Sequence, residues 1–171
     1  MSVPPSGPSS NLAPVQSVTD ARLGWLFVTG QFILLGALLV EVGGAEETSS
    51  LRWVLGVLAA VGGGAIAIMG SRQLGRELRT HPAPSDRAVL RDDGPYRFVR
   101  HPIYAGLLLL AVGLVMVAGT VLAAATFLAL FALLSFKARF EERLLAERFS
   151  GYREYARRTP RFVPRLRRPS G

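Results

Sequence analysis

Residues 103–136 read IYAGLLLLAVGLVMVAGTVLAAATFLALFALLSF, 34 consecutive positions without a charged side chain. As one helix this stretch would be ~50 Å long at ~1.5 Å per residue. The hydrocarbon core of a bilayer is only ~30 Å thick and takes ~20 helical residues. Ala118-Gly119-Thr120 lies near the middle of the stretch and offers a place to turn. We therefore expect two short membrane helices, 103–118 and 121–136, joined as a tight hairpin.

Two further apolar segments precede this hairpin, at about 23–42 and 53–70. The first is interrupted mainly by Gln31, with Glu41 near its end. Both segments are long enough to cross a bilayer. The expected fold is all-α: a polytopic membrane protein with about four transmembrane helices, a C-terminal hairpin and a cytoplasmic helical cap.

The length of 171 residues fits a single domain. Residues 1–20 are rich in proline and serine and contain no basic residue, a composition typical of a disordered tail and unlike a secretory signal. We expect residues 21–171 to form one membrane-embedded domain, whose C-terminal segment, 137–171, lies in the cytoplasm.

The distribution of arginine predicts the orientation. The link 71–100 carries seven arginines, and segment 137–171 carries ten arginines and one lysine, whereas Arg52 is the only basic residue between the first two spans. Short basic loops stay in the cytoplasm. We therefore expect an integral protein of a prokaryotic-type inner (cytoplasmic) membrane, with both termini inside. This bias explains most of the net charge of +8, so no nucleic-acid partner is expected; the expected partner is the lipid bilayer.

Other features exclude several classes of site. The chain has no cysteine and only two histidines, His81 and His101, so disulfides, thiolate metal sites and a histidine-rich metal cage are excluded, and no metal is expected. The segment GGGAIA, 62–67, matches a loose dinucleotide fingerprint, but that pattern has meaning only between a strand and a helix. Gly56, Ala60 and Gly64 instead recur every four residues, which predicts close helix packing within or between subunits.

The stretch GPYRFVRHPIYAG, 94–106, places charge at the start of the third span. Pro102 suits the first turn of a helix, and the free N–H groups and dipole at that end favour an anion. Arg97 and Arg100 come just before it, and Tyr104 lies three residues after His101. Anchoring at the membrane interface is the alternative reading, favoured for Tyr96 and Arg97.

Glu141 and Glu142 are expected to lie opposite this cationic helix end. No helix breaker follows the fourth span until Gly151, so the helix should continue into the cytoplasm with the acidic pair ~8 Å beyond the membrane. The hairpin brings the start of one helix beside the end of the other. A zwitterion would fit, with its carboxylate at Arg100 and its ammonium at either glutamate. Alternatively, the glutamates are solvated partners of neighbouring basic residues.

GPYRFVRHPIYAG, followed by a hairpin and EERLLAERFSGYREYARRTPRFVPRL, resembles the integral-membrane isoprenylcysteine carboxyl methyltransferase and phospholipid methyltransferase families, over roughly residues 72–164. Those enzymes use S-adenosyl-L-methionine. The family tail usually reads F-G-x-x-Y-x-x-Y, and Phe149-Ser150-Gly151-Tyr152 is one residue shorter. RRTPRF, 157–162, resembles an element that closes over the cofactor. The resemblance implies catalytic residues Arg100 and Glu142, substrate-binding residues Arg97 and Arg161, and these cofactor-binding residues: His101, Pro102, Tyr104, Gly106, Glu141, Glu142, Tyr152 and Tyr155.

The implied reaction is a direct in-line methyl transfer to a lipid-like acceptor. A carboxylate acceptor needs a neighbouring cation, which Arg100 would supply, whereas an amine needs a base, Glu141 or Glu142. Prenylated cysteine, phosphatidylethanolamine, an isoprenoid acid and a small thiol all remain open as acceptors. Two other functions remain: an NADPH-dependent enzyme like the membrane sterol reductases, which share an R-H-P-x-Y-x-G segment, and a non-catalytic membrane scaffold.

Overall fold

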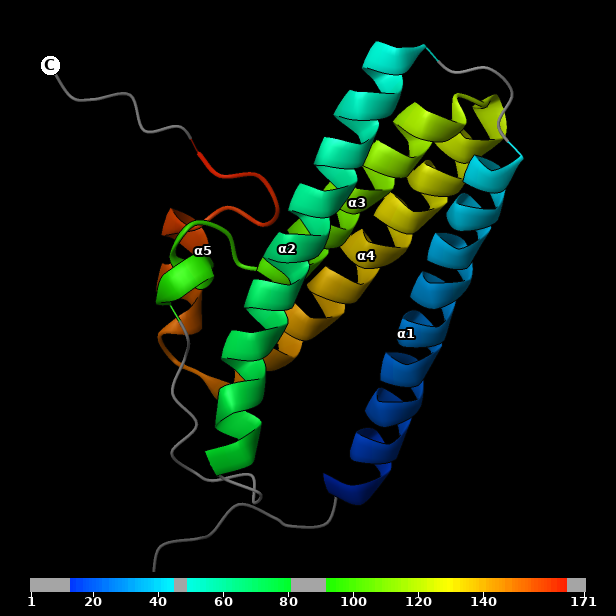
Figure 1. Ribbon diagram of the computed structural model, residues 1–171. Helices are drawn as coiled ribbons and strands as arrows, with labels where there is room; N and C mark the ends of the chain where they lie inside the picture. Colours follow the sequence, from blue (N-terminus) through cyan, green and yellow to red (C-terminus); the bar gives the residue numbers. More distant parts are fainter. Residues whose placement is uncertain (1–12, 45–48, 81–91, 166–171) are drawn as a thin grey trace, which may run out of the picture.

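The structure, a computed structural model, describes residues 13–44, 49–80 and 92–165, and it contains no strand in that part of the chain (Figure 1). Its helices, with η1 a short 3-10 helix, are α1 (Ala13–Gly43), α2 (Ser50–Thr80), η1 (Gly94–Arg97), α3 (Pro102–Ala118), α4 (Val121–Arg148) and α5 (Tyr152–Arg158). Three of them, α1, α2 and α4, are long and apolar enough to cross a membrane, and α3 is a shorter apolar helix. The predicted all-α polytopic fold is confirmed.

The α3–α4 hairpin turns at the predicted place. Gly119 has φ of 69°, the left-handed conformation that favours glycine, and its N–H donates to Val115 O at 2.9 Å. Thr120 then caps α4, because its hydroxyl accepts from Ala123 N at 3.0 Å. Arg52, from the start of α2, donates to Met116 O at 3.1 Å. Three residues, Gly119, Thr120 and Arg52, therefore form hydrogen bonds with polar groups that a turn between two membrane helices leaves open.

Helices α1 and α2 are longer than the predicted spans 23–42 and 53–70. Residues 13–20, predicted as part of the disordered tail, are helical; residues 1–12 lie outside the described residues. Pro14 occupies the first turn of α1, where a missing N–H leaves no bond unmade. After Gly70 the chain has no proline before Pro82, and α2 continues to Thr80.

Helices α2 and α3 approach through small residues. A Cβ on Gly63 would lie 2.3 Å from Leu110 N, and one on Gly113 would lie 2.3 Å from Gly56 O. The small residues of α2 at this contact are Gly56, Ala60, Gly63, Ala67 and Gly70. Their spacing of three and four residues is that of a left-handed helix pair. The prediction was wrong for Gly64, where a Cβ would make an ordinary contact at 3.8 Å, because a strict four-residue repeat drifts around the helix.

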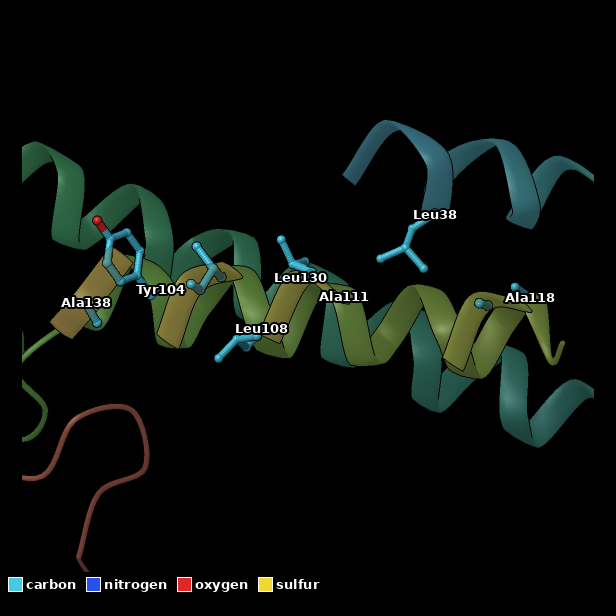
Figure 2. Packing of buried hydrophobic residues seen from close by; sticks show 9 residues of the cluster. Leu38, Tyr104, Leu108, Ala111, Ala118, Leu130 and Ala138 are labelled. Carbon is cyan, nitrogen blue, oxygen red and sulfur yellow. The ribbon is translucent and has the colours of Figure 1, made fainter. Parts of the chain in front are cut away.

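A buried apolar cluster joins α1, α3 and α4. Figure 2 shows Leu38, Leu108 and Leu130 along it, with Tyr104 and Ala138 at one end. Lipid is as apolar as leucine, so this packing is stabilised by close contact rather than by removal from water. The apolar cluster ends at Tyr104, and the charged groups begin there.

The start of α3 is recessed between longer neighbours. A Cβ on Gly70 would lie 2.9 Å from Ile103, at the first turn of α3, and α2 continues ten residues further, to Thr80, which is ~15 Å of helix. Helix α5 lies beside η1 (Figure 1), since the Tyr155 hydroxyl donates to Tyr96 O at 2.7 Å. The recess, η1 and α5 together frame the site.

Candidate active site

Glu142 is the centre of a buried charge cluster. Arg161 binds it with two hydrogen bonds, Nε to Oε1 at 2.9 Å and Nη2 to Oε2 at 2.6 Å. His101 Nε2 lies 3.1 Å from Oε1, and Arg100 Nη1 lies 3.4 Å from it. The Glu142 side chain is only 12% exposed. Fork-to-fork pairing of this kind is geometrically specific, so Glu142 holds two arginines and a histidine in fixed positions.

Glu141 has a more open environment. It accepts a hydrogen bond of 2.6 Å from the Tyr104 hydroxyl, and its other oxygen lies 3.7 Å from His101 Nδ1. Its side chain is 36% exposed. The rings of His101 and Tyr104 are stacked, with centroids 5.2 Å apart and planes 6° from parallel. The imidazole therefore lies between two carboxylates, one buried and one accessible.

Local sequence explains how α3 presents these groups. Pro102 begins the helix and is fully buried, and His101 occupies the cap position, with its carbonyl accepting from Ala105 N at 2.9 Å. Tyr104 follows His101 by three residues and therefore lies on the same face. The uninterrupted continuation of α4 carries Glu141 and Glu142 to that face. The predicted juxtaposition of a cationic helix start and an acidic helix extension is present.

The C-terminal segment completes the cluster from the other side. Arg100 N donates to Pro160 O at 2.8 Å, and His101 N donates to Arg161 O at 3.1 Å. The Phe162 ring follows, 6.1 Å from the His101 ring. This backbone pairing delivers the Arg161 side chain to Glu142. Hydrogen bonding to Glu142 raises the pKa of Arg161, so this guanidinium stays charged.

Two tyrosines of α5 lie behind Arg100. Burial, and then the Glu142 carboxylate, raise the pKa of Tyr152, although the Arg100 guanidinium is close enough to offset part of the rise. Burial likewise raises the pKa of Tyr155. Both hydroxyls stay protonated at neutral pH. Among the described residues, Tyr152 Oη and Arg100 Nε are buried without a hydrogen bond of good geometry.

Two predicted site residues, Gly106 and Arg97, lie apart from the cluster, and Tyr155 lies at its edge, behind Arg100. Gly106 faces α2, where a Cβ would lie 2.5 Å from Ala67 N, so it serves helix packing. Arg97 is exposed on η1, with its guanidinium 4.5 Å from the Phe98 ring centroid. Tyr155 holds α5 against η1 through its bond to Tyr96. Cofactor or substrate roles for these residues remain predictions.

Sequence reasoning did not single out Lys137. Its side chain is buried, and Nζ lies 5.0 Å from the Tyr104 ring centroid. One signal could have identified it: it is the only lysine in a chain whose other basic residues are arginines. Among residues 13–44, 49–80 and 92–165 no group of three or more His, Cys, Asp or Glu side chains is placed to hold a metal ion.

The apolar helices define an integral membrane protein with a charged site at the end of its bundle. Residues 51–151 match the phospholipid methyltransferase family, and the chain belongs to that family. It is therefore related to membrane methyltransferases, as the sequence resemblance predicted.

Two curated proteins are similar to part of the chain. The cobalt-zinc-cadmium resistance protein CzcN of Cupriavidus metallidurans is 40% identical over 79 residues, which are 46% of this chain and 37% of that protein. The nickel-cobalt-cadmium resistance protein NccN of Alcaligenes xylosoxydans xylosoxydans is 38% identical over 74 residues, 43% of this chain and 35% of that protein. The chain thus spans little more than a third of the length of these curated relatives. No solved structure matches the chain.

Proposed function

We propose that the protein is an S-adenosyl-L-methionine-dependent methyltransferase that acts on a lipid-like acceptor at the cytoplasmic face of the membrane. The observation that carries this proposal is the cluster in which Arg100, His101 and Tyr104 meet Glu141 and Glu142. Members of the matched family generally use this cofactor. We further propose that residues 21–171 act as one membrane-embedded domain with 137–171 in the cytoplasm.

The site fits a cofactor that carries both charges. Glu141 is accessible enough to receive an ammonium group. Arg100 Nε and the Tyr152 hydroxyl are buried without a well-formed hydrogen bond, and the two side chains lie close enough to interact with each other; a bound carboxylate would complete their hydrogen bonding. A buried polar group left unpaired costs about 1–3 kcal/mol, which a ligand would recover. These residues, with His101 and Tyr104, are the ones we propose to hold the cofactor.

When bound, S-adenosyl-L-methionine supplies an electrophilic methyl group on a sulfonium, and the carbon–sulfur bond breaks as the acceptor's lone pair attacks. By holding the cofactor's carboxylate, Arg100 would place that methyl group in line for the attack. Glu142, predicted to be catalytic, is engaged by Arg100, His101 and Arg161, which favours a positioning role. Glu141 is the carboxylate that remains open to take a proton from an amine acceptor.

The position of the site supports a lipid-like acceptor. The first turn of α3 lies at the end of an apolar helix, and the neighbouring α4 surface is apolar and exposed at Phe131 and Phe136. An amphiphile in the bilayer can therefore approach with its tail in lipid and its polar end at the cluster. The C-terminal segment, paired with Arg100 and His101, excludes water from the opposite side.

Calorimetric titration of the purified full-length protein with S-adenosylhomocysteine and, separately, with NADPH tests the proposal. We expect the first to bind and the second not to bind. Binding of NADPH alone would support the sterol-reductase-like alternative, and binding of neither would support a non-catalytic scaffold.

A further inference from the structure

Lys137 is a buried cation that the proposed methyl-transfer site does not yet use. Its side chain is only 9% exposed, on the same helix as Glu141 and one turn before it. Every other basic side chain of the protein is an arginine. The arginine guanidinium is planar and forms paired hydrogen bonds, whereas the lysine ammonium is a compact point charge. A single lysine at a buried position is therefore the residue suited to a small anionic group.

The Lys137 ammonium has no ion pair or hydrogen bond to another described residue. Nζ lies over the face of Tyr104, 5.0 Å from the ring centroid, and Tyr104 in turn donates its hydroxyl to Glu141. The Glu141 charge acts on Lys137 from one turn away, without a direct ion pair. A cation–π contact stabilises an ion by less than its desolvation costs. An anion in contact with Nζ would offset the remainder.

The charges around Lys137 leave one cation in excess. Arg100 and Arg161 both pair with the Glu142 carboxylate, and Glu141, the second carboxylate of the cluster, contacts His101 and Tyr104. Lys137 is the third cation. It lies four residues before Glu141 along α4, which is ~6 Å nearer the apolar part of the bundle. An anion that pairs with it must therefore come from the membrane side of the cluster.

We propose that Lys137 binds the anionic group, a carboxylate or a phosphate, of the methyl acceptor, so that the acceptor class is an anionic amphiphile. This inference rests on the proposed function and narrows its acceptor. The cofactor then binds around Arg100 and Glu141. The acceptor enters from lipid along α4 and places its charged group at Lys137. Lys137 is a substrate-binding residue and does not belong to the charge cluster around Glu142.

Because the chain has one lysine, selective ¹⁵N labelling of lysine side chains gives one Nζ resonance in an NMR spectrum. The full-length protein is titrated in an uncharged maltoside detergent with hexadecanoate, hexadecyl phosphate or hexadecyltrimethylammonium. The Nζ resonance should shift with both anionic amphiphiles and stay unchanged with the cationic one. Acetate and inorganic phosphate at the same concentrations should shift it at least tenfold less. Equal shifts with the free anions, or none with the amphiphiles, would overturn the assignment.

Binding of radiolabelled hexadecanoate to variants completes the test. Lys137→Met should weaken this binding at least tenfold, and Lys137→Arg, which keeps the charge on a larger planar group, should weaken it less than Lys137→Met does. Arg139→Met, an exposed cation two residues away, is the matched control and should stay within twofold. S-adenosylhomocysteine should bind all variants within twofold, and this binding also shows that each variant is folded.

Lost S-adenosylhomocysteine binding in Lys137→Met, with hexadecanoate binding unaffected, would assign Lys137 to the cofactor and refute the inference. Wild type that binds no S-adenosylhomocysteine would instead refute the proposed function.

Discussion

Glu141 and Glu142 are adjacent in sequence but differ in what surrounds them. Successive residues on a helix point about 100° apart, so Glu142 faces Arg100 and Arg161 while Glu141 faces the Tyr104 hydroxyl. The Glu142 side chain is 12% exposed, and the Glu141 side chain is 36% exposed. One carboxylate therefore fixes the site's cations, and the other is available to a ligand or a proton.

Replacing Arg100 with alanine should abolish methyl transfer without preventing membrane insertion. The change removes the guanidinium that lies 3.4 Å from Glu142 and keeps the backbone hydrogen bond to the Pro160 carbonyl. Removing one preorganised charged or hydrogen-bonding group from an active site typically lowers the rate roughly hundredfold to thousandfold. Incubation of membranes with a radiolabelled methyl donor, followed by lipid extraction, measures the rate.

Arg139→Ala is the control for that change, because Arg139 is exposed and its guanidinium lies over the Phe136 ring. Its rate should equal wild type. Alanine at both Glu141 and Glu142 should lose activity like Arg100→Ala. Full activity in either site variant would remove the proposed site.

Tyr104→Phe should weaken S-adenosylhomocysteine binding while leaving the fold unchanged. The variant keeps the ring that stacks on His101 and loses the hydroxyl that donates to Glu141 at 2.6 Å. A hydrogen bond contributes about 0.5–1.5 kcal/mol, so we expect a loss of roughly threefold to tenfold by calorimetry. An unchanged affinity would show that the orientation of Glu141 does not matter for the cofactor.

The meeting of Arg100 and His101 with the acidic pair could be predicted because a hairpin brings its two ends together whatever the side chains. The contact of Arg100 with the Pro160 carbonyl could not. It is a backbone hydrogen bond between irregular segments, and such bonds depend on the course of the backbone rather than on residue type. Lys137 was missed for another reason: on a sequence it looks like one more basic residue after a membrane span.

At the scale of helices, the α2–α3 contact depends on the absence of side chains at particular positions. Gly63→Ala should destabilise the protein, because its Cβ would meet backbone atoms of α3 at 2.3 Å and helices cannot easily move apart there. Overpacking costs about 1–3 kcal/mol, a fall in Tm of roughly 3–10 °C. Thermal unfolding in detergent measures it.

The neighbouring glycine provides the matched control. Gly64→Ala adds the same methyl group one residue away, where the nearest atom is a flexible leucine terminus at 3.8 Å. It should leave Tm unchanged or slightly raised, since alanine has the higher helix propensity. Equal destabilisation by both substitutions would mean that the contact face of α2 is assigned wrongly.

Existence and order of the helices could be read from apolar runs, but their ends could not. Membrane thickness limits the apolar part of a span and says nothing about how far a helix continues in water. Thus α2 extends to Thr80 and α1 begins at Ala13. Only the α3–α4 turn could be placed closely, because Gly119 and Thr120 are residues with a specific role at helix ends.

For the whole molecule, the two ends of the bundle differ in charge. At the end that holds the site lie the described basic residues of α4, α5 and the C-terminal segment, together with Arg97 and Arg100. At the other end Arg52 caps the hairpin, and Glu41 accepts a hydrogen bond from Thr126 at 2.9 Å. Because basic segments stay in the cytoplasm, the site end should face inward.

The lack of cysteine makes this orientation testable with single introduced cysteines and a membrane-impermeant maleimide. Gly44 and Gly151 are exposed, lie beyond opposite ends of the bundle and have room for a side chain. Gly44→Cys should be labelled in intact spheroplasts, and Gly151→Cys only after permeabilisation. Ala111→Cys, at a fully buried position, should stay unlabelled in both and reports background. Three helices, α2, α3 and α4, lie between the two positions, so labelling of both glycine positions from the same side would contradict the assignment of all three as spans. The reverse pattern would place the site outside, where a cytoplasmic methyl donor could not reach it.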